Sequence, residues 1–124
     1  CSKPLPTALE NTLDYPHVSM PSSASVRQYI DADLLSKGLR FNPVFEVDHI
    51  ATIGALVSEG LGISALPETA ISLLKAEQLA HIPLSAPGIQ RPLGIVTRRH
   101  ASPSLAAQEL SQMLKTSLSM LLKR

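Results

Sequence analysis

The sequence has no tryptophan, and aromatic residues together make up only 3% of its 124 residues. A hydrophobic core must therefore be built mostly from leucine, isoleucine, valine and alanine. The hydrophobic content of 44% is that of a globular protein. The length corresponds to one compact domain.

Cysteine occurs only once, at Cys1. A single cysteine excludes an internal disulfide and a zinc site built from several cysteines. The four histidines are scattered without the spacing of metal ligands, so we expect no metal site. The sequence does not begin with methionine, and we expect it to be a piece of a longer protein.

Neither sign of charge dominates, because the formal net charge is only +1. Nucleic-acid binding needs a concentrated cationic face, whereas Arg98-Arg99 is the only basic cluster that stands out. No apolar run approaches the roughly 20 residues that span a bilayer. The N-terminus also lacks the charged-then-apolar pattern of a signal peptide. We therefore expect no nucleic-acid or membrane contact by this segment, and a cytoplasmic location.

The stretch 44–67 combines strand and helix patterns in one continuous unit. Phe45 and Val47 alternate with the polar Glu46, as residues of a strand do. Asp48 is the predicted N-cap of the helix that follows, and Gly60 is its predicted stop. The short apolar run 62–66 is typical of a buried strand. Two strands joined through a helix lie parallel, so this stretch predicts a βαβ unit.

A second strand–helix pair precedes this unit. The segment 18–20 is a short strand candidate, and 7–13 contains one helical turn. Ser25 and Gln28 have the spacing of a capping box at the start of a helix, which Gly38 ends.

The rest of the chain continues the alternation. We predict a short helix over 68–75, strands over 79–84 and 91–98, and a long C-terminal helix with Ser102 as its N-cap. The last helix carries a broad apolar stripe. The resulting fold class is α/β, with a mainly parallel sheet flanked by helices.

Three segments together resemble the effector-binding domain of LysR-type transcriptional regulators: PHVSMPSSASVRQYID, FEVDHIATIGALVSEGLGISALPE and RPLGIVTRRHASPSLAAQELSQML. Within them, LVSEGLGISALP resembles that family's helix–glycine–strand–proline signature. The resemblance covers nearly the whole chain. It implies a lobe of the type II periplasmic-binding-protein fold, with 1–90 as the second lobe. Residues 91–124 would be the return crossover strand and the C-terminal helix that belong with the first lobe.

The same resemblance implies a sensor and not an enzyme, without catalytic residues or a cofactor. A small-molecule effector, such as a carboxylate, would bind between two lobes and change the geometry of a DNA-bound oligomer. The DNA would be contacted by an N-terminal domain that this chain does not contain, and the protein would be a homo-oligomer.

The candidate ligand-binding residues lie at two strand-to-helix junctions, where free N–H groups at a helix start can accept an anion. A neutral histidine there can donate or accept a hydrogen bond. Capping is the competing role for Ser22 and Ser23, and it is the one we favour for Asp48. The resemblance implies a pocket formed by the following residues: Met20, Pro21, Ser22, Ser23, Val47, Asp48, His49 and Ile50.

Two other function classes remain open from the residues alone. One is a solute-binding module of the periplasmic-binding-protein type, and the other is a small α/β hydrolase. The sequence disfavours a hydrolase, because Ser64 lacks the second glycine of a nucleophile elbow and lies in a predicted strand. The segment 60–62 has two glycines of a dinucleotide fingerprint, but in the reverse strand–helix order.

Overall fold

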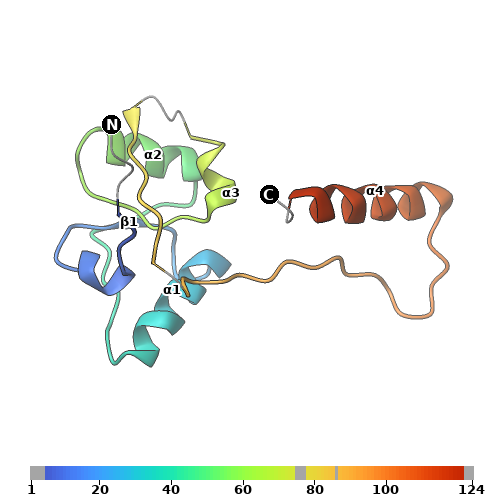
Figure 1. Ribbon diagram of the computed structural model, residues 1–124, viewed down its shortest axis with the longest axis horizontal. Helices are drawn as coiled ribbons and strands as arrows, with labels where there is room; N and C mark the ends of the chain where they lie inside the picture. The colour runs from blue at the N-terminus through green and yellow to red at the C-terminus, as the bar shows by residue number, and fades with distance from the viewer. Residues whose placement is uncertain (1–4, 75–77, 86, 122–124) are drawn as a thin grey trace. The chain divides into compact units, whose positions relative to one another are not determined.

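The structure is a computed structural model that describes residues 5–74, 78–85 and 87–121 (Figure 1). The chain divides into two units, Cys1–Arg91 and Pro92–Arg124. The described elements of the first unit are the 3-10 helix η1 (Leu9–Thr12), β1 (Val18–Ser19), α1 (Ser25–Ser36), β2 (Phe45–Glu46), α2 (Ile50–Ser58) and α3 (Glu68–Ile71). The second unit contains α4 (Leu105–Leu121).

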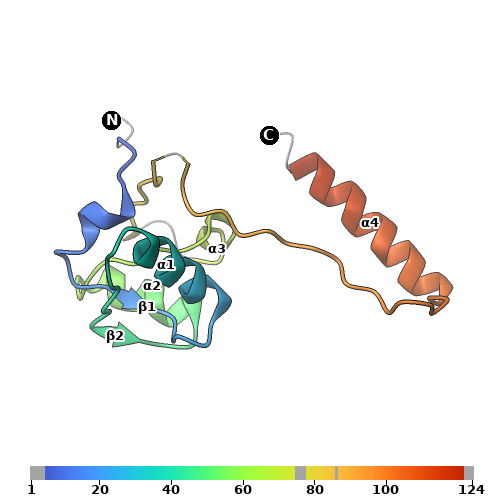
Figure 2. The same ribbon diagram turned by 90° about the horizontal axis from the view of Figure 1, so that it is seen from below.

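Strand β1 is the centre of a small parallel sheet (Figure 2). On one side it pairs with β2, in the register that places Val18 opposite Phe45. On the other side His17 forms a parallel bridge with Ile63, and the Val18 N–H donates to the Ile63 carbonyl at 2.8 Å. The two extended segments that α2 connects are therefore parallel, as predicted, with β1 between them. Helices around a small parallel sheet are in keeping with the predicted α/β class.

The sheet is smaller than the sequence predicted. The predicted strand at 62–66 is reduced to the single bridge at Ile63. Its partner cannot extend the ladder toward the N-terminus, because Pro16 has no N–H to donate. Pro16 does accept a hydrogen bond from the Ile63 N–H, at 2.9 Å. The apolar run is only half-buried, and an apolar run alone does not create a strand.

The other two predicted strands are also wrong in the described residues. The segment 79–84 contributes only one bridge, between Thr7 and Leu84, and 91–98 is extended without a described strand partner. Pro83 and Pro92 each lack the donor that a ladder needs.

Two glycines end the helices of the first unit, as the sequence predicted. Gly38 follows α1 with φ of 72°, and Gly60 follows α2 with φ of 77°. After α1, the Leu39 N–H donates to the Leu34 carbonyl and the Gly38 N–H to the Leu35 carbonyl, both at 2.9 Å. This pair of bonds is the Schellman motif, which requires a left-handed residue that glycine adopts without steric cost.

The helix starts differ from the predicted ones. The N-cap of α1 is Ala24, so Ser25 is the first helical residue and the predicted capping box is wrong. The N-cap of α2 is His49, so Asp48 lies one residue too early to cap this helix. Neither cap makes a side-chain hydrogen bond. Polar residues precede each helix, but the path by which the chain enters places the cap at Ala24 in α1 and at His49 in α2.

The core of the first unit is mostly aliphatic, as the scarcity of aromatic residues predicted, with Phe41 as its one aromatic member among the described residues. Leu9, Ile30, Leu34 and Phe41 form one buried cluster between η1, α1 and the segment after α1. Leu34 and Ile53 are 0% exposed, which places both α1 and α2 against the interior.

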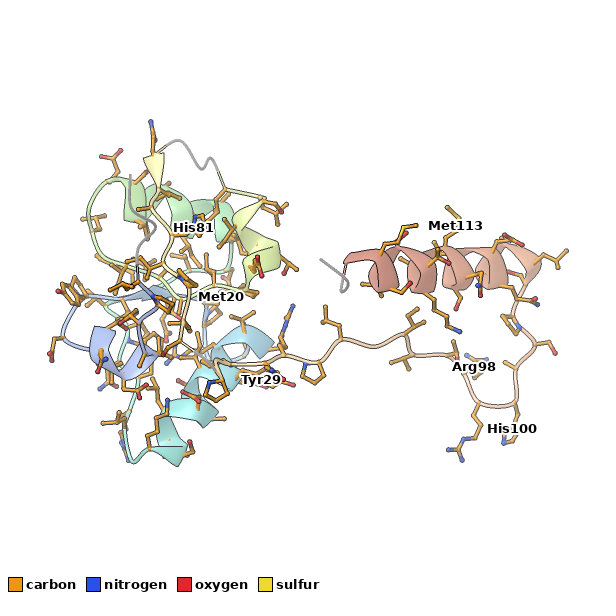
Figure 3. The ribbon with its side chains drawn as sticks, viewed as in Figure 1. Met20, Tyr29, His81, Arg98, His100 and Met113 are labelled. Atoms are coloured by element: carbon orange, nitrogen blue, oxygen red, sulfur yellow. The ribbon has the colours of Figure 1, made fainter. Side chains whose placement is uncertain are left out.

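The second unit consists of an extended segment and α4. The helix begins at Leu105, and the Ser104 hydroxyl accepts from the Ala107 N–H at 3.3 Å, so the predicted Ser102 cap is two residues early. Its apolar side chains are exposed, including Met113 (Figure 3), which is 65% exposed. Among the described residues, no helix combines the length and the apolar character needed to cross a membrane.

Candidate functional site

An open groove of about 390 Å³ lies in the first unit where α1 and α2 begin. Ser25, the first residue of α1, and Ile50, the first residue of α2, both border it. The first N–H groups of a helix have no partner within the helix, and they carry a partial positive charge. Two helix starts therefore contribute to one groove. Its remaining walls come from the end of β1 and the region of α3.

The groove lining contains two of the eight residues that the sequence singled out. Met20 (Figure 3) follows β1 directly, and Ile50 opens α2. Both are half-buried apolar side chains. Because Met20 belongs to the strand-to-helix junction before α1 and Ile50 to the one before α2, both junctions border the same groove.

The other residues of the first junction lie outside the lining. Ser22 and Ser23 are exposed in a turn that the Ala24 N–H closes by donating to the Pro21 carbonyl at 2.9 Å. At the second junction, Val47 extends the pairing beyond β2, because its N–H donates to the Ser19 carbonyl at 2.9 Å.

Asp48 and His49 complete the second junction, and both are exposed just before α2. Neither they nor Val47 lines the groove. The ligand-binding roles of these residues, and of Pro21, Ser22 and Ser23, stay predictions.

Arg91 is a groove residue that the sequence analysis did not single out. It is half-buried, and its Nη1 donates to the Ser25 hydroxyl at 3.1 Å. It is the only charged residue among the lining residues that the structure describes. No sequence signal distinguished it, because an arginine beside Pro92 looks like an ordinary end of a strand.

Arg27 is a second residue that the sequence analysis missed, and it supports the end of β1, which borders the groove. Its side chain is buried on α1, with only 7% of the residue exposed. The guanidinium donates to Glu46 of β2 at 2.6 Å, to Asp31 at 2.9 Å and to the Met20 carbonyl at 3.2 Å. It also lies 4.9 Å from the centre of the Phe41 ring, which is cation–π geometry.

These contacts keep Arg27 charged. Burial alone would lower the pKa of Arg27, but the hydrogen bonds to Glu46 and Asp31 outweigh it and raise the pKa above its ordinary value. Because the same guanidinium holds the Met20 carbonyl, it ties a groove residue to α1 and β2. A sequence signal did exist, since Arg27 stands three residues before Ile30 and so shares the buried face of α1.

Replacing Arg27 with methionine is expected to lower the free energy of unfolding by about 2 kcal/mol. The change keeps much of the apolar stem, but it leaves two carboxylates and the Met20 carbonyl without their donor. The cost is below that of a fully buried ion pair, because Asp31 and Glu46 are 39% and 47% exposed. Urea unfolding followed by circular dichroism measures the difference.

Lys37 is the matched control for this change. It also pairs with two carboxylates, Glu10 at 2.9 Å and Asp33 at 3.0 Å, but its side chain is 40% exposed. Exposed ion pairs contribute little, because water solvates the separated charges. Lys37→Met should therefore cost much less than Arg27→Met, and equal losses would contradict the structural role of Arg27.

His17 is buried in the sheet and not in the groove. Its Nε2 lies 3.0 Å from the Thr12 carbonyl, and its ring meets the edge of Phe41 with centroids 5.0 Å apart. Burial lowers the pKa of His17, partly offset by the hydrogen bond to Thr12, so the ring is neutral at pH 7. Its role is packing between η1 and β1.

In 5–74, 78–85 and 87–121, no three His, Cys, Asp or Glu side chains gather as metal ligands do. The Ser64 hydroxyl is buried and has no hydrogen-bond partner in this part of the chain. A serine nucleophile is activated by a hydrogen bond to its base, and the described geometry gives Ser64 no such bond.

Comparisons with known proteins identify the family. The chain matches the model of the LysR substrate binding domain over residues 2–119. It is 35% identical over 105 residues to the uncharacterized HTH-type transcriptional regulator YbhD of Escherichia coli, covering 85% of this chain and 33% of that protein. It is 38% identical over 84 residues to the uncharacterized HTH-type transcriptional regulator YfeR of Shigella flexneri, covering 68% of this chain and 27% of that protein.

The chain therefore spans a third or less of the length of these relatives. The search of solved structures gave no significant match. The match to the family model extends over nearly the whole chain, and both relatives are named as transcriptional regulators. This confirms the resemblance seen in the sequence: the chain belongs to the LysR substrate-binding domain family.

Proposed function

We propose that this chain is the effector-sensing part of a LysR-type transcriptional regulator, with the effector held in the groove where α1 and α2 begin. Membership of the substrate-binding family supports the sensing role. The observation that carries the site is that Ser25 and Ile50, the first residues of two helices, border one groove. In open α/β sheets, ligands bind beyond the carboxyl ends of parallel strands, which is where β1 leads into Met20.

The domain assignment is part of this proposal. Residues 1–90 would form the second lobe, and 91–124 would be the return crossover and the helix that belongs with the first lobe. The division of the chain at Arg91 is in keeping with it. The exposed apolar stripe of α4 supports it too, because soluble proteins rarely leave such a face uncovered.

The effector would be bound and not transformed. A molecule that fits one relative arrangement of two lobes better than another shifts the population toward that arrangement. In a homo-oligomer, this shift would reposition DNA-binding domains outside this chain and so couple effector binding to DNA binding. The exposed residues Ser22, Ser23, Asp48 and His49 flank the two helix starts. In this proposal they contact the effector from the rim when the lobes close.

The test is a titration of the isotope-labelled chain with a panel of organic acids, amino acids, sugars and sugar phosphates. We expect at least one of these compounds to shift the amide signals of Met20, Ile50 and Thr69. Failure of every compound to shift these signals, or shifts confined to other regions, would contradict the groove as the effector site.

Two tryptophan variants test whether the effector binds in the groove. Thr69 is an exposed groove residue of α3, so Thr69→Trp should fill the groove and weaken binding at least about 10-fold, since a buried ligand tolerates little overlap. Ser72 is exposed just after α3 and lies outside the lining, so Ser72→Trp should leave affinity unchanged. Equal effects of the two variants would place binding elsewhere.

A further inference from the structure

The groove has an uneven charge balance. Of the described residues in its lining, Arg91 is the only charged one, and none of them is acidic. Among the residues that the structure describes, Arg91 makes no ion pair, and its one hydrogen bond goes to the Ser25 hydroxyl. A guanidinium has five N–H donors. Most of its hydrogen-bonding capacity is therefore available to a molecule in the groove.

The rest of the lining is mainly apolar. Met20, Val26, Ile50 and Leu73 contribute hydrocarbon or thioether side chains, and Ala70 lies at the buried base. Ala24 and Pro67 are also apolar, and Ser25 and Thr69 add two hydroxyl side chains. A groove of about 390 Å³ belongs to the low end of the range for small-molecule sites. Its chemistry therefore offers one cationic end and a short apolar wall.

We propose that the effector carries one carboxylate, placed on the Arg91 guanidinium, and a short apolar body that packs on Met20, Ile50 and Leu73. This inference rests on the proposed effector site. A carboxylate matches the planar fork of a guanidinium and accepts two parallel hydrogen bonds from it. The first turn of α1 begins at Ser25, beside Arg91, and its positive end adds to the same attraction.

Other ligand classes fit these residues less well. A cationic ligand would be repelled by Arg91 and would find no carboxylate among the described lining residues. A phosphate dianion is usually held by several cations, and the described lining supplies one. A neutral polar molecule would leave the Arg91 guanidinium without an opposite charge. It would also leave the apolar side chains of the groove partly exposed to water. A monoanion with a hydrocarbon portion can pair with the guanidinium and pack on the apolar side chains at the same time.

The experiment compares hexanoate with hexanamide, which has nearly the same shape but no charge. Both are titrated into the 124-residue chain while the amide signals of Met20, Ile50 and Thr69 are followed. We expect hexanoate to bind about 10-fold more tightly than hexanamide, because the charge-assisted pair is lost in the amide. Shortening the acid by one methylene should weaken binding by about 4-fold.

Three variants test whether Arg91 is responsible. Arg91→Gln should lower the affinity for hexanoate by about 10-fold and leave hexanamide unchanged, and Arg91→Lys should keep part of the preference for the acid. Arg40→Gln removes the same charge from an exposed position outside the groove lining, and it should keep the full preference. The folded state of each variant is checked by its amide spectrum without ligand.

The outcomes separate this inference from the proposed function. Equal binding of hexanoate and hexanamide at the groove would overturn the carboxylate assignment while leaving the groove as the effector site. The same holds if the preference for the acid survives Arg91→Gln. If neither probe, nor any compound of the wider panel, shifts the groove signals, both the inference and the proposed site fail.

Discussion

Replacing Leu34 with alanine is expected to lower the free energy of unfolding by about 3 kcal/mol. Leu34 is 0% exposed and belongs to the buried cluster of Leu9, Ile30 and Phe41. The substitution removes apolar surface from the core and leaves a cavity that the aliphatic neighbours fill only partly. The small core makes this loss a large share of the total stability.

The neighbouring leucine provides a matched control in the same helix. Leu35 is 68% exposed, so Leu35→Ala removes the same atoms from a position that contacts little. Alanine also has the higher helix propensity, and the control should change stability by less than about 0.5 kcal/mol. Urea unfolding of the variants, followed by circular dichroism, gives the two differences. Similar losses at the two positions would show that α1 does not pack as the structure describes.

Replacing Gly62 with alanine is expected to destabilise the fold by about 2–3 kcal/mol, through crowding and not through a cavity. A Cβ atom at Gly62 would collide with the backbone carbonyl oxygen of Pro16. This carbonyl accepts the hydrogen bond from Ile63 at 2.9 Å, so the added methyl would separate Ile63 from the strand at His17 and Val18. Backbone atoms on both sides cannot move aside as the end of a side chain can.

Gly94 is the control for the glycine change. A Cβ atom there meets nothing within 4 Å, so Gly94→Ala should leave the unfolding transition of the chain unchanged. The predicted signature of Gly62→Ala is also local. Hydrogen exchange of the Val18 and Ile63 amides should speed up more than that of the core of α1, because the sheet contact is disrupted first. Unchanged exchange at these two amides would contradict the close approach of the two segments.

The substitutions Leu34→Ala and Gly62→Ala bear on the proposed site, because Leu34 and Gly62 support the packing of the elements that border the groove. Leu34 fixes α1 against the core, and Gly62 lets the chain after α2 pack beside β1. The first residues of α1 and α2 border the groove, and we expect the groove to be disturbed when either support is removed. Arg27 adds a third support, since it joins α1 and β2 to the Met20 carbonyl.

Local patterns in the sequence predicted several features that the structure has. The glycine stops at Gly38 and Gly60 were correct, because the preference of glycine for positive φ acts within one turn of the chain. The aliphatic core and the parallel relation of the extended segments were also predictable. The family was recognisable from residue order alone, and the family match over residues 2–119 confirms it.

The extent of the sheet and the helix caps were not predictable in the same way. An apolar run such as 62–66 indicates burial, but a strand exists only where a second backbone lies in register beside it. Asp48 and Ser25 were sensible caps by residue type, and the path of the chain into each helix placed the cap elsewhere. Only the three-dimensional arrangement decides which of the neighbouring residues becomes the cap.

By itself, the sequence determined the family, the aliphatic character of the core and the positions where α1 and α2 end, because each depends on residue type or on neighbours within a few positions. The tertiary structure alone decided which charged residues matter. Arg27 meets Glu46 across 19 positions, and Arg91 meets Ser25 across 66. Such pairs follow from the way the chain folds back on itself, and no local pattern encodes them.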